Sequence, residues 1–394
     1  MFHLLTYARK SLGWVALLVI GLGLAACDGV PTGAGGNGGP TINTRSAVPV
    51  ALLVPGGSGQ ASDDLLAQSL ENAARLAIAD LGDVEIDLRV YNTAGQAAQA
   101  ATVAEQAVAD GAKIILGPIF AEESNAAGVA VAGQNINVLS FSNNTDIAGG
   151  NVFVLGNTFQ NTAERLVGYA ARQGKARIAI VQDRTTAGDV GRRAIEAAAA
   201  AAGVTIAATG SYEFSQEGVV AAIPTIAASL RASGADAVVL TADSAGALPL
   251  LTQLLSENQV NPATTTFIGL TRWDIPAATL DLPGVQGGWF ALPDPALAQQ
   301  FSARYAAAYG EQPHPISGLA YDGIAAIGAL VKAGRSNALA VSGLTQGSGF
   351  VGVNGVFRLR ADGTNQRGLA IAQILNHQVV IIDPAPRAFG GTGF

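Results

Sequence analysis

Residues that could carry out catalysis are few, and their spacing does not favour an active site. Glu122 and Glu123 could act as a paired general acid and base. Side chains of adjacent residues on a loop or strand diverge, so two solvated carboxylates are the better interpretation. His314 stands between two prolines, which indicates a rigid loop. The motifs G-x-S-x-G, S-x-x-K, H-E-x-x-H and G-x-x-x-x-G-K-[ST] are absent, so the sequence predicts that the protein is not an enzyme.

The sequence also gives little support for a metal or a bound cofactor. Its single cysteine is Cys27, and its histidines, His3, His314 and His377, are far apart. A metal site built from cysteine or histidine is therefore not expected. Gly57-Ser-Gly59 hints at a dinucleotide-binding loop, but the third glycine of that motif is missing, so a tight turn is the better interpretation. We expect no metal and no cofactor.

Composition and charge narrow the possible partners. Hydrophobic residues make up 49% of the 394 residues and charged residues 13%, so a sizeable core is expected. The formal net charge is −7, and the sequence has no basic run. An acidic chain of this kind is not expected to bind nucleic acid.

The N-terminus carries an export signal. Arg9 and Lys10 precede an apolar stretch from Leu12 to Leu24, which is too short for a membrane-spanning helix and predicts a signal peptide over residues 1–26. Leu24-Ala-Ala-Cys27 resembles the lipobox of bacterial lipoproteins, in which the cysteine is lipidated. This resemblance implies a periplasmic protein that is anchored by Cys27 to the inner or the outer membrane.

Residues 27–46 are rich in glycine and contain almost no large apolar side chain. This composition predicts a flexible tether between the lipidated cysteine and the folded part of the chain. The folded part is expected to begin near Ala47.

From Val48 onward, short apolar runs alternate with longer amphipathic stretches, which predicts alternating strands and helices. The first predicted strands are Val48 to Val54, Glu85 to Tyr91, Ile114 to Gly117 and Asn137 to Phe141, with helices over Gln96 to Asp110 and Ser124 to Gly133. Four predicted helices each end at a glycine that precedes a β-branched apolar run; these glycines are Gly111, Gly174, Gly203 and Gly234. This repeat predicts an α/β fold with parallel sheets and helices on both faces.

Breaks in the pattern predict two lobes. The alternation pauses near Gly156 and again from Gly284 to Asp294, which suits crossings between lobes. Phe350 to Leu359 and Ala370 to Ile382 then read as strands, with Asp362-Gly363 as a turn. We therefore expect the chain to return to a lobe and not to begin a third domain.

Several passages occur in an order that is typical of one family. They are the first strand and turn Val50 to Gly59, Tyr91-Asn-Thr93, Gly111 to Pro118, Val138 to Ser142, Arg177 to Asp183, Ala320-Tyr-Asp322, and Asn354 to Gly363. From Val48 to Asp383 the chain thereby resembles the type I periplasmic solute-binding proteins, in particular their leucine/isoleucine/valine-binding branch.

The resemblance implies two Rossmann-like lobes joined by a hinge of three crossings. One lobe would hold residues 47–157 and 287–340, and the other 158–286 and 341–383, with 384–394 as a tail. In this family the lobes close over a ligand by a hinge motion.

Ligands of open α/β sheets bind beyond the carboxyl ends of the strands, and this rule selects the loops of the candidate site. The predicted ligand-binding residues are Ser58, Phe120, Glu122, Ser140, Ser142, Asn143, Asn144, Asp183, Thr186, Asp243, Arg272 and Trp273. Trp273 and Trp289 could either stack on a ligand or line the hinge.

Two functions are compatible with the sequence. The first is a receptor that delivers a small polar, amino-acid-like solute to the permease of an ABC importer. Arg272 and Trp273 stand where amino-acid binders of the family carry an acidic group, so a zwitterionic ligand loses its usual partner. With these departures, the chain also resembles the penicillin-binding-protein activator lipoproteins, which share the fold. That resemblance implies a peptidoglycan synthase as partner and no small-molecule ligand.

Overall fold

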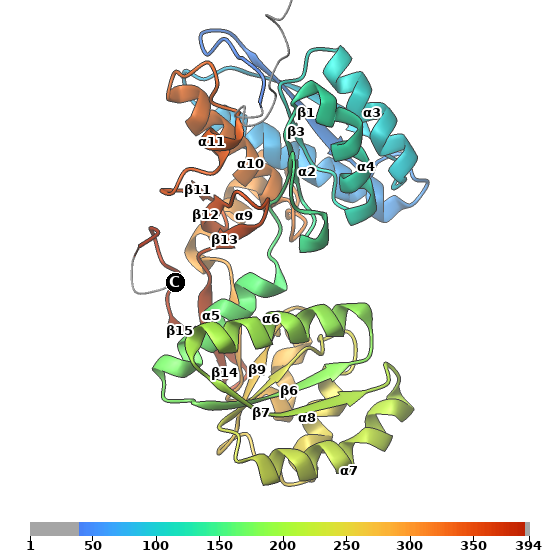
Figure 1. Cartoon of the computed structure of the whole chain (residues 1–394), viewed down its shortest axis with the longest axis vertical. Coiled ribbons are helices and arrows are strands. Elements are labelled where there is room, and N and C mark those ends of the chain that lie inside the picture. The colour runs from blue at the N-terminus through green and yellow to red at the C-terminus, as the bar shows by residue number, and fades with distance from the viewer. Residues whose placement is uncertain (1–38, 391–394) are drawn as a thin grey trace, which may run out of the picture. The chain divides into compact units, whose positions relative to one another are not determined.

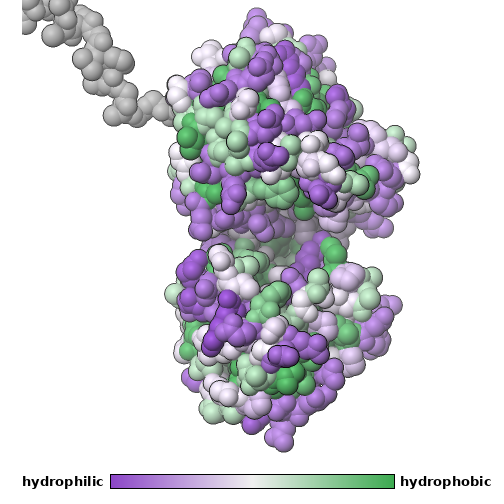
Figure 2. Space-filling view, turned by 90° about the vertical axis from the view of Figure 1, so that its right-hand side faces the viewer, coloured by the Kyte–Doolittle hydropathy of each residue, from purple (hydrophilic) through white to green (hydrophobic). Residues whose placement is uncertain are grey.

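The computed structural model describes residues 39–390. The predicted signal peptide, Cys27 and the first part of the predicted tether lie outside the described residues. Within the described part, no helix combines the length and the apolar character that crossing a membrane requires. On the face seen in Figure 2, hydrophobic residues are scattered among hydrophilic ones and do not form one large patch.

The first lobe is built on a parallel five-stranded sheet in the order β2-β1-β3-β4-β5, with helices on both faces (Figure 1). Its strands are β1 (Val48–Val54), β2 (Ile86–Asn92), β3 (Ile114–Leu116), β4 (Val138–Ser140) and β5 (Val152–Val154). Its helices are α2 (Ala61–Asp80), α3 (Ala97–Ala109), α4 (Ala121–Val131), α9 (Pro295–Tyr309), α10 (Gly318–Lys332) and α11 (Val341–Leu344). Leu52 of β1 packs with α2 and α10, and its neighbour Leu53 packs with α3 and α4. Successive side chains of a strand thus bury themselves in two separate cores.

The second lobe repeats the strand order of the first, with β7-β6-β8-β9-β10 in place of β2-β1-β3-β4-β5, and adds β14 and β15 at one edge. Its sheet runs β15-β14-β10-β9-β8-β6-β7, and only β14 and β15 are antiparallel to their neighbours. The strands are β6 (Arg177–Asp183), β7 (Thr205–Tyr212), β8 (Ala237–Leu240), β9 (Thr266–Gly269), β10 (Trp289–Leu292), β14 (Ala370–Leu375) and β15 (Gln378–Asp383). Helices α5 (Phe159–Arg172) and α6 (Thr186–Ala202) cover one face, and α7 (Gln216–Ser233) and α8 (Leu248–Glu257) the other.

The predicted fold class is confirmed, and so is the role of the repeated glycines. Gly203 and Gly234 end α6 and α7 with φ angles of 69° and 63°. A residue with a side chain is strained in this left-handed conformation, whereas glycine is not. Each glycine therefore stops its helix and returns the chain toward the next strand.

Two of the predicted lobe boundaries are wrong. β10 was expected in the first lobe but pairs with β9 and β14 of the second. β11 (Phe350–Gly352) and β12 (Gly355–Leu359) were expected in the second lobe, but Phe350 and Phe357 pack in the core of the first. The second crossing therefore lies at Pro293 and the third just after β13 (Asn365–Arg367).

The folded part also begins earlier than predicted. Ile42 lies in the predicted tether, yet its side chain is 5% exposed and belongs to the core of the first lobe. Its N–H donates to the carbonyl of Ser336 at 2.8 Å. Gly39 packs so closely on the backbone of Ala340 that a side chain would not fit there. Apolar burial, a backbone hydrogen bond and close backbone packing together fix this segment to the first lobe.

A buried ion pair between β13 and α10 lies beside the first crossing. The side chains of Arg367 and Asp322 are 1% and 0% exposed, and Arg367 Nη1 lies 3.0 Å from Asp322 Oδ2. Arg367 Nε also donates to the carbonyl of Leu155, in the first crossing, at 2.8 Å. Asp322 in turn accepts from the N–H of Val353 at 2.8 Å. Arg367, the last residue of β13 before the third crossing, is thereby bonded to the first crossing and to α10.

Replacing Arg367 tests this arrangement. Arg367→Met leaves Asp322 as an unpaired buried carboxylate, which costs about 3–5 kcal/mol of unfolding free energy. Arg360→Met is the matched control, because Arg360 forms a half-buried pair with Glu164 at the longer distance of 3.7 Å, and a pair that water still reaches contributes about 1 kcal/mol or less. Urea unfolding followed by circular dichroism measures both. Equal stability of the two variants would contradict the proposed role of the pair.

Candidate functional site

A cavity of about 510 Å³ is lined by residues from both lobes. Ile119 and Phe120 follow the carboxyl end of β3, and Arg272 follows that of β9. Asn157 and Pro293 belong to the first and second crossings. The cavity thus lies where both parallel sheets end and where the chain passes between lobes, a place at which α/β proteins bind ligands.

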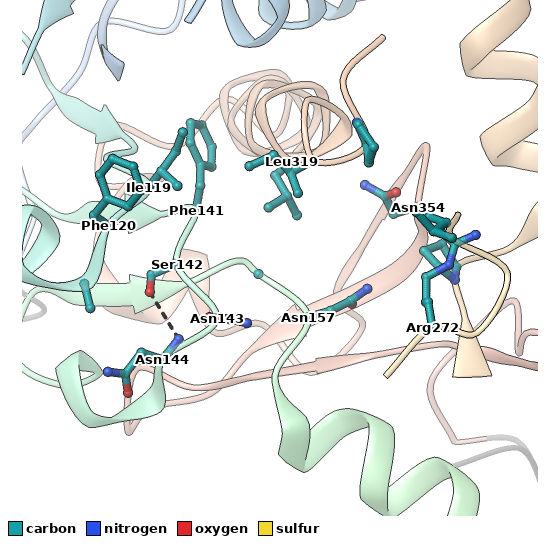
Figure 3. A pocket seen from close by; sticks show the side chains of 16 residues that line it. Ile119, Phe120, Phe141, Ser142, Asn143, Asn144, Asn157, Arg272, Leu319 and Asn354 are labelled. Carbon is teal, nitrogen blue, oxygen red and sulfur yellow. Dashed lines mark hydrogen bonds between the residues drawn. The ribbon is translucent and has the colours of Figure 1, made fainter. Parts of the chain in front are cut away.

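The wall of the cavity is apolar on one side. Phe141 and Leu319 are almost fully buried in the first lobe and present their edges to the cavity (Figure 3). Phe120 is 43% exposed, unusual for a large aromatic side chain. Together these side chains form a surface for the hydrophobic body of a ligand.

A rigid turn after β4 supplies polar groups. Ser140 Oγ accepts the N–H of Ser142 at 3.0 Å and lies 2.7 Å from Ser124 Oγ. Ser142 Oγ accepts the N–H of Asn144 at 3.1 Å (Figure 3). Asn143, between them, is exposed at the cavity and forms no side-chain hydrogen bond with the described residues. Its amide is therefore available to a ligand.

Two further asparagines line the cavity, Asn157 from the first crossing and Asn354 from the turn between β11 and β12. Asn157 is exposed in the cavity, and its side chain likewise has no hydrogen-bond partner among residues 39–390. Asn354 Nδ2 donates to Asp322 Oδ2 at 3.0 Å, which ties this part of the lining to the buried ion pair. Neither residue was predicted. Because the crossings of a two-lobed protein border the space between its lobes, the pause near Gly156 was a usable signal for Asn157.

Arg272 is the one charged side chain among the described residues that line the cavity. Its Nε donates to Asp274 Oδ1 at 2.9 Å and its Nη2 to Asp274 Oδ2 at 2.5 Å. This two-fold contact fixes the guanidinium plane, and Nη1 has no hydrogen-bond partner within residues 39–390. Figure 3 shows Arg272 and Asn354 at the opposite side of the view from Phe120.

The structure brings together five of the predicted ligand-binding residues, namely Phe120, Ser142, Asn143, Asn144 and Arg272. Ser140 supports them from behind and does not line the cavity. Trp273 is 0% exposed and packs between Gly269 and Gly288 in the core of the second lobe, where a side chain on either glycine would collide with its indole ring. It has no surface that a ligand could reach.

The remaining predicted residues lie elsewhere. Asp183 is buried, where it accepts hydrogen bonds from Thr185 and Thr241. Thr186 is exposed at the start of α6. Asp243 accepts the N–H of Gly246 at 2.6 Å in the turn before α8. These residues shape loops at the carboxyl edge of the second sheet and do not line the cavity.

Ser58 and Glu122 lie at a second pocket or beside it. This pocket, of about 440 Å³, is lined by Asp63, Glu122 and Glu123, and Ser58 Oγ donates to Asp63 Oδ2 at 2.7 Å. Glu123 accepts the hydroxyl of Thr93 at 2.9 Å. Burial raises the pKa of the Glu123 carboxyl above its ordinary value near 4.5, and the charge of Asp63 acts in the same direction.

Comparisons with known proteins agree with this architecture. Residues 47–378 match a family model described as periplasmic binding protein. The sequence matches no curated protein. Many solved structures share the fold, and three of them show the kind of protein concerned. One is a branched chain amino acid ABC transporter periplasmic ligand-binding protein from Burkholderia xenovorans LB400, with 18% identity, a TM-score of 0.67 and coverage of 88% of this chain and 97% of that one.

The other two are complexes. An ABC transporter substrate-binding protein from Desulfitobacterium hafniense in complex with Leu has 19% identity and a TM-score of 0.63, covering 86% of this chain and 100% of that one. A solute binding protein of an ABC transporter from Rhodopseudomonas palustris BisB5, in complex with 3,4-dihydroxy benzoic acid, has 16% identity and a TM-score of 0.59, covering 86% and 96%. At these identities the likeness is one of fold.

The raised pKa of Glu123 predicts a dependence of stability on pH. The folded protein holds this proton more tightly than the unfolded chain, so unfolding free energy is lost as the pH rises from about 4.5 through the folded-state pKa. Glu123→Gln does not titrate. The melting temperature of this variant minus that of the wild type should therefore increase between pH 4 and pH 7.5. Glu122→Gln, at the exposed neighbour, should show a smaller change, and equal changes would contradict the assignment.

Proposed function

The chain belongs to the periplasmic binding protein family, and we propose that it is the solute receptor of an ABC importer, closing its lobes over a small polar, amino-acid-sized solute. The 510 Å³ cavity carries this proposal, because both lobes and two crossings contribute to its lining. Leu and 3,4-dihydroxy benzoic acid, held by two proteins of the same fold, are solutes of the size that such a cavity admits.

The lining indicates how a solute would be held. The apolar part of the solute would lie against Phe141 and Leu319. Its polar groups would meet the free amides of Asn143 and Asn157 and the free Nη1 of Arg272. Residues of the first lobe and of the second lobe can contact the solute at the same time only when the lobes are closed. Binding would therefore favour closure about the three crossings.

The proposal extends to the partner and to the anchor. A receptor of an importer delivers its solute to a membrane permease, and a lipid on Cys27 would keep the receptor near it. Leu24-Ala-Ala-Cys27 supports the anchor, although it lies outside the described residues. Residues 39–390 contribute no membrane-crossing helix.

A thermal-shift screen tests solute binding. The chain is expressed from Asp28, which keeps all described residues, and is mixed with amino acids, aromatic acids, short peptides and polyamines. A solute at 100 times its Kd adds about 2.7 kcal/mol to the unfolding free energy, so at least one class should raise the melting temperature clearly. The double variant Asn143→Ala/Asn157→Ala should bind that solute about tenfold more weakly or worse, since two hydrogen bonds are lost.

Asn125→Ala is the matched control, because Asn125 is an exposed asparagine on α4 outside the cavity. Its response to the solute should equal that of the wild type. A flat response of the folded wild type to every solute would contradict the receptor function. Co-purification with a peptidoglycan synthase would then support the activator function instead.

Lipidation is tested in cells that express the full chain. An alkyne-bearing palmitate should label the wild-type protein. After cell fractionation, the wild-type protein should be found in the membrane fraction. Cys27→Ser should abolish the label, since the thiol that accepts the lipid is gone, whereas the neighbouring change Asp28→Asn should retain it. Label that persists in Cys27→Ser would exclude Cys27 as the anchor.

A further inference from the structure

The second pocket is acidic and adjoins the first. Its lining includes the carboxylates of Asp63, Glu122 and Glu123 and, among the residues that the structure describes, no basic side chain. Phe120 and Ala121 line both this pocket and the 510 Å³ cavity, so the two spaces meet at the start of α4. A solute lying in the larger cavity could therefore extend one end into the acidic pocket.

The place of the pocket in the sheet is one that ligands occupy. In the order β2-β1-β3-β4-β5, the connection from β1 turns to one side of the sheet and that from β3 to the other. Asp63 follows β1 at the start of α2, and Glu122 and Glu123 follow β3 at the start of α4. The pocket thus lies outside the point where the strand order reverses, which is the usual ligand site of such sheets.

Helix capping explains only part of the acidic cluster. Carboxylates in the first turn stabilise a helix, which accounts for the presence of Glu122. Glu123, however, is 1% exposed, and its Oε2 has no hydrogen-bond partner among the described residues. A buried carboxylate oxygen without a partner is costly, and more so beside the charge of Asp63, which raises its pKa. A positive charge in the pocket would relieve this cost.

The shape of the pocket favours an organic cation over a metal ion. Within residues 39–390, no group of three or more acidic, histidine or cysteine side chains is close enough to hold a metal. The half-exposed ring of Phe120 instead offers a flat face, on which an ammonium or guanidinium group binds favourably. A side chain at Gly95 would stand 3.9 Å from Asp63, Ser58 and the Phe120 ring, so the absence of one there leaves room for such a group.

We propose that the acidic pocket binds the terminal amine or guanidinium of the solute whose body occupies the larger cavity. The inference rests on the proposed receptor function and narrows its substrate class. The solute carries its positive charge at the end of an apolar spacer, away from the groups that meet Asn143 and Arg272. An ω-amino acid or a diamine has this form, whereas the ammonium of an α-amino acid stands next to its carboxylate.

Matched pairs of compounds test the proposal by thermal shift and calorimetry. The chain from Asp28 is titrated with ω-amino acids from 4-aminobutyrate to 6-aminohexanoate and with cadaverine. The amine-free partners are the corresponding fatty acids and pentane-1,5-diol. At least one amine should raise the melting temperature, and its amine-free partner should bind at least tenfold more weakly. Glu122→Gln and Asp63→Asn should each weaken that amine tenfold or more, whereas Glu105→Gln, an exposed carboxylate on α3, should not.

Each other outcome overturns the proposal in a recognisable way. If amine-free solutes bind as well as their amines, or if the amine binds Glu122→Gln as tightly as the wild type, the receptor function stands and the acidic subsite does not. A rise caused by CaCl₂ that is lost in Glu122→Gln would replace the organic cation by a metal. If neither these compounds nor the wider solute screen stabilise the folded protein, both proposals fail.

Discussion

The arrangement of the molecule depends on one buried ion pair. Arg367 and Asp322 are both removed from water, and neither charge is tolerable there without the other. Arg367 can meet Asp322 and the carbonyl of Leu155 only if the end of β13 and the first crossing lie side by side against α10. Asn354, held by the same carboxylate, then faces the cavity. One ion pair thus links the first crossing to Asn354, a residue of the cavity lining.

Much of the fold could be predicted from local sequence signals, whereas the pairing of strands that are distant in the sequence could not. Glycine after a helix followed by a branched apolar run is a signal contained in a few residues, as at Gly203 and Gly234. Which sheet a strand joins depends on distant partners. β10 is buried, and its apolar sequence suits either lobe, so its pairing with β9 and β14 decides the matter. The same limit misplaced β11 and β12.

The site shows a similar division. The rule that ligands bind beyond the carboxyl ends of strands located the turn at Ser142–Asn144 and the loop at Arg272. It does not specify which way each side chain of a loop points. Arg272 faces the cavity while its neighbour Trp273 turns into the core, and no periodicity within an irregular loop distinguishes them. Asn354 lies in the turn between β11 and β12, so it could be placed only once the lobe that holds these two strands was known.

The interleaving of the two lobes along the chain also governs the order in which they can be completed. The core of the first lobe needs Phe350 and Phe357, and the sheet of the second needs β14, so neither is whole until most of the chain has been synthesised. Contacts of such large sequence separation form slowly. If the chain is exported from its N-terminus, neither domain can therefore be finished until nearly all of the chain has crossed the membrane.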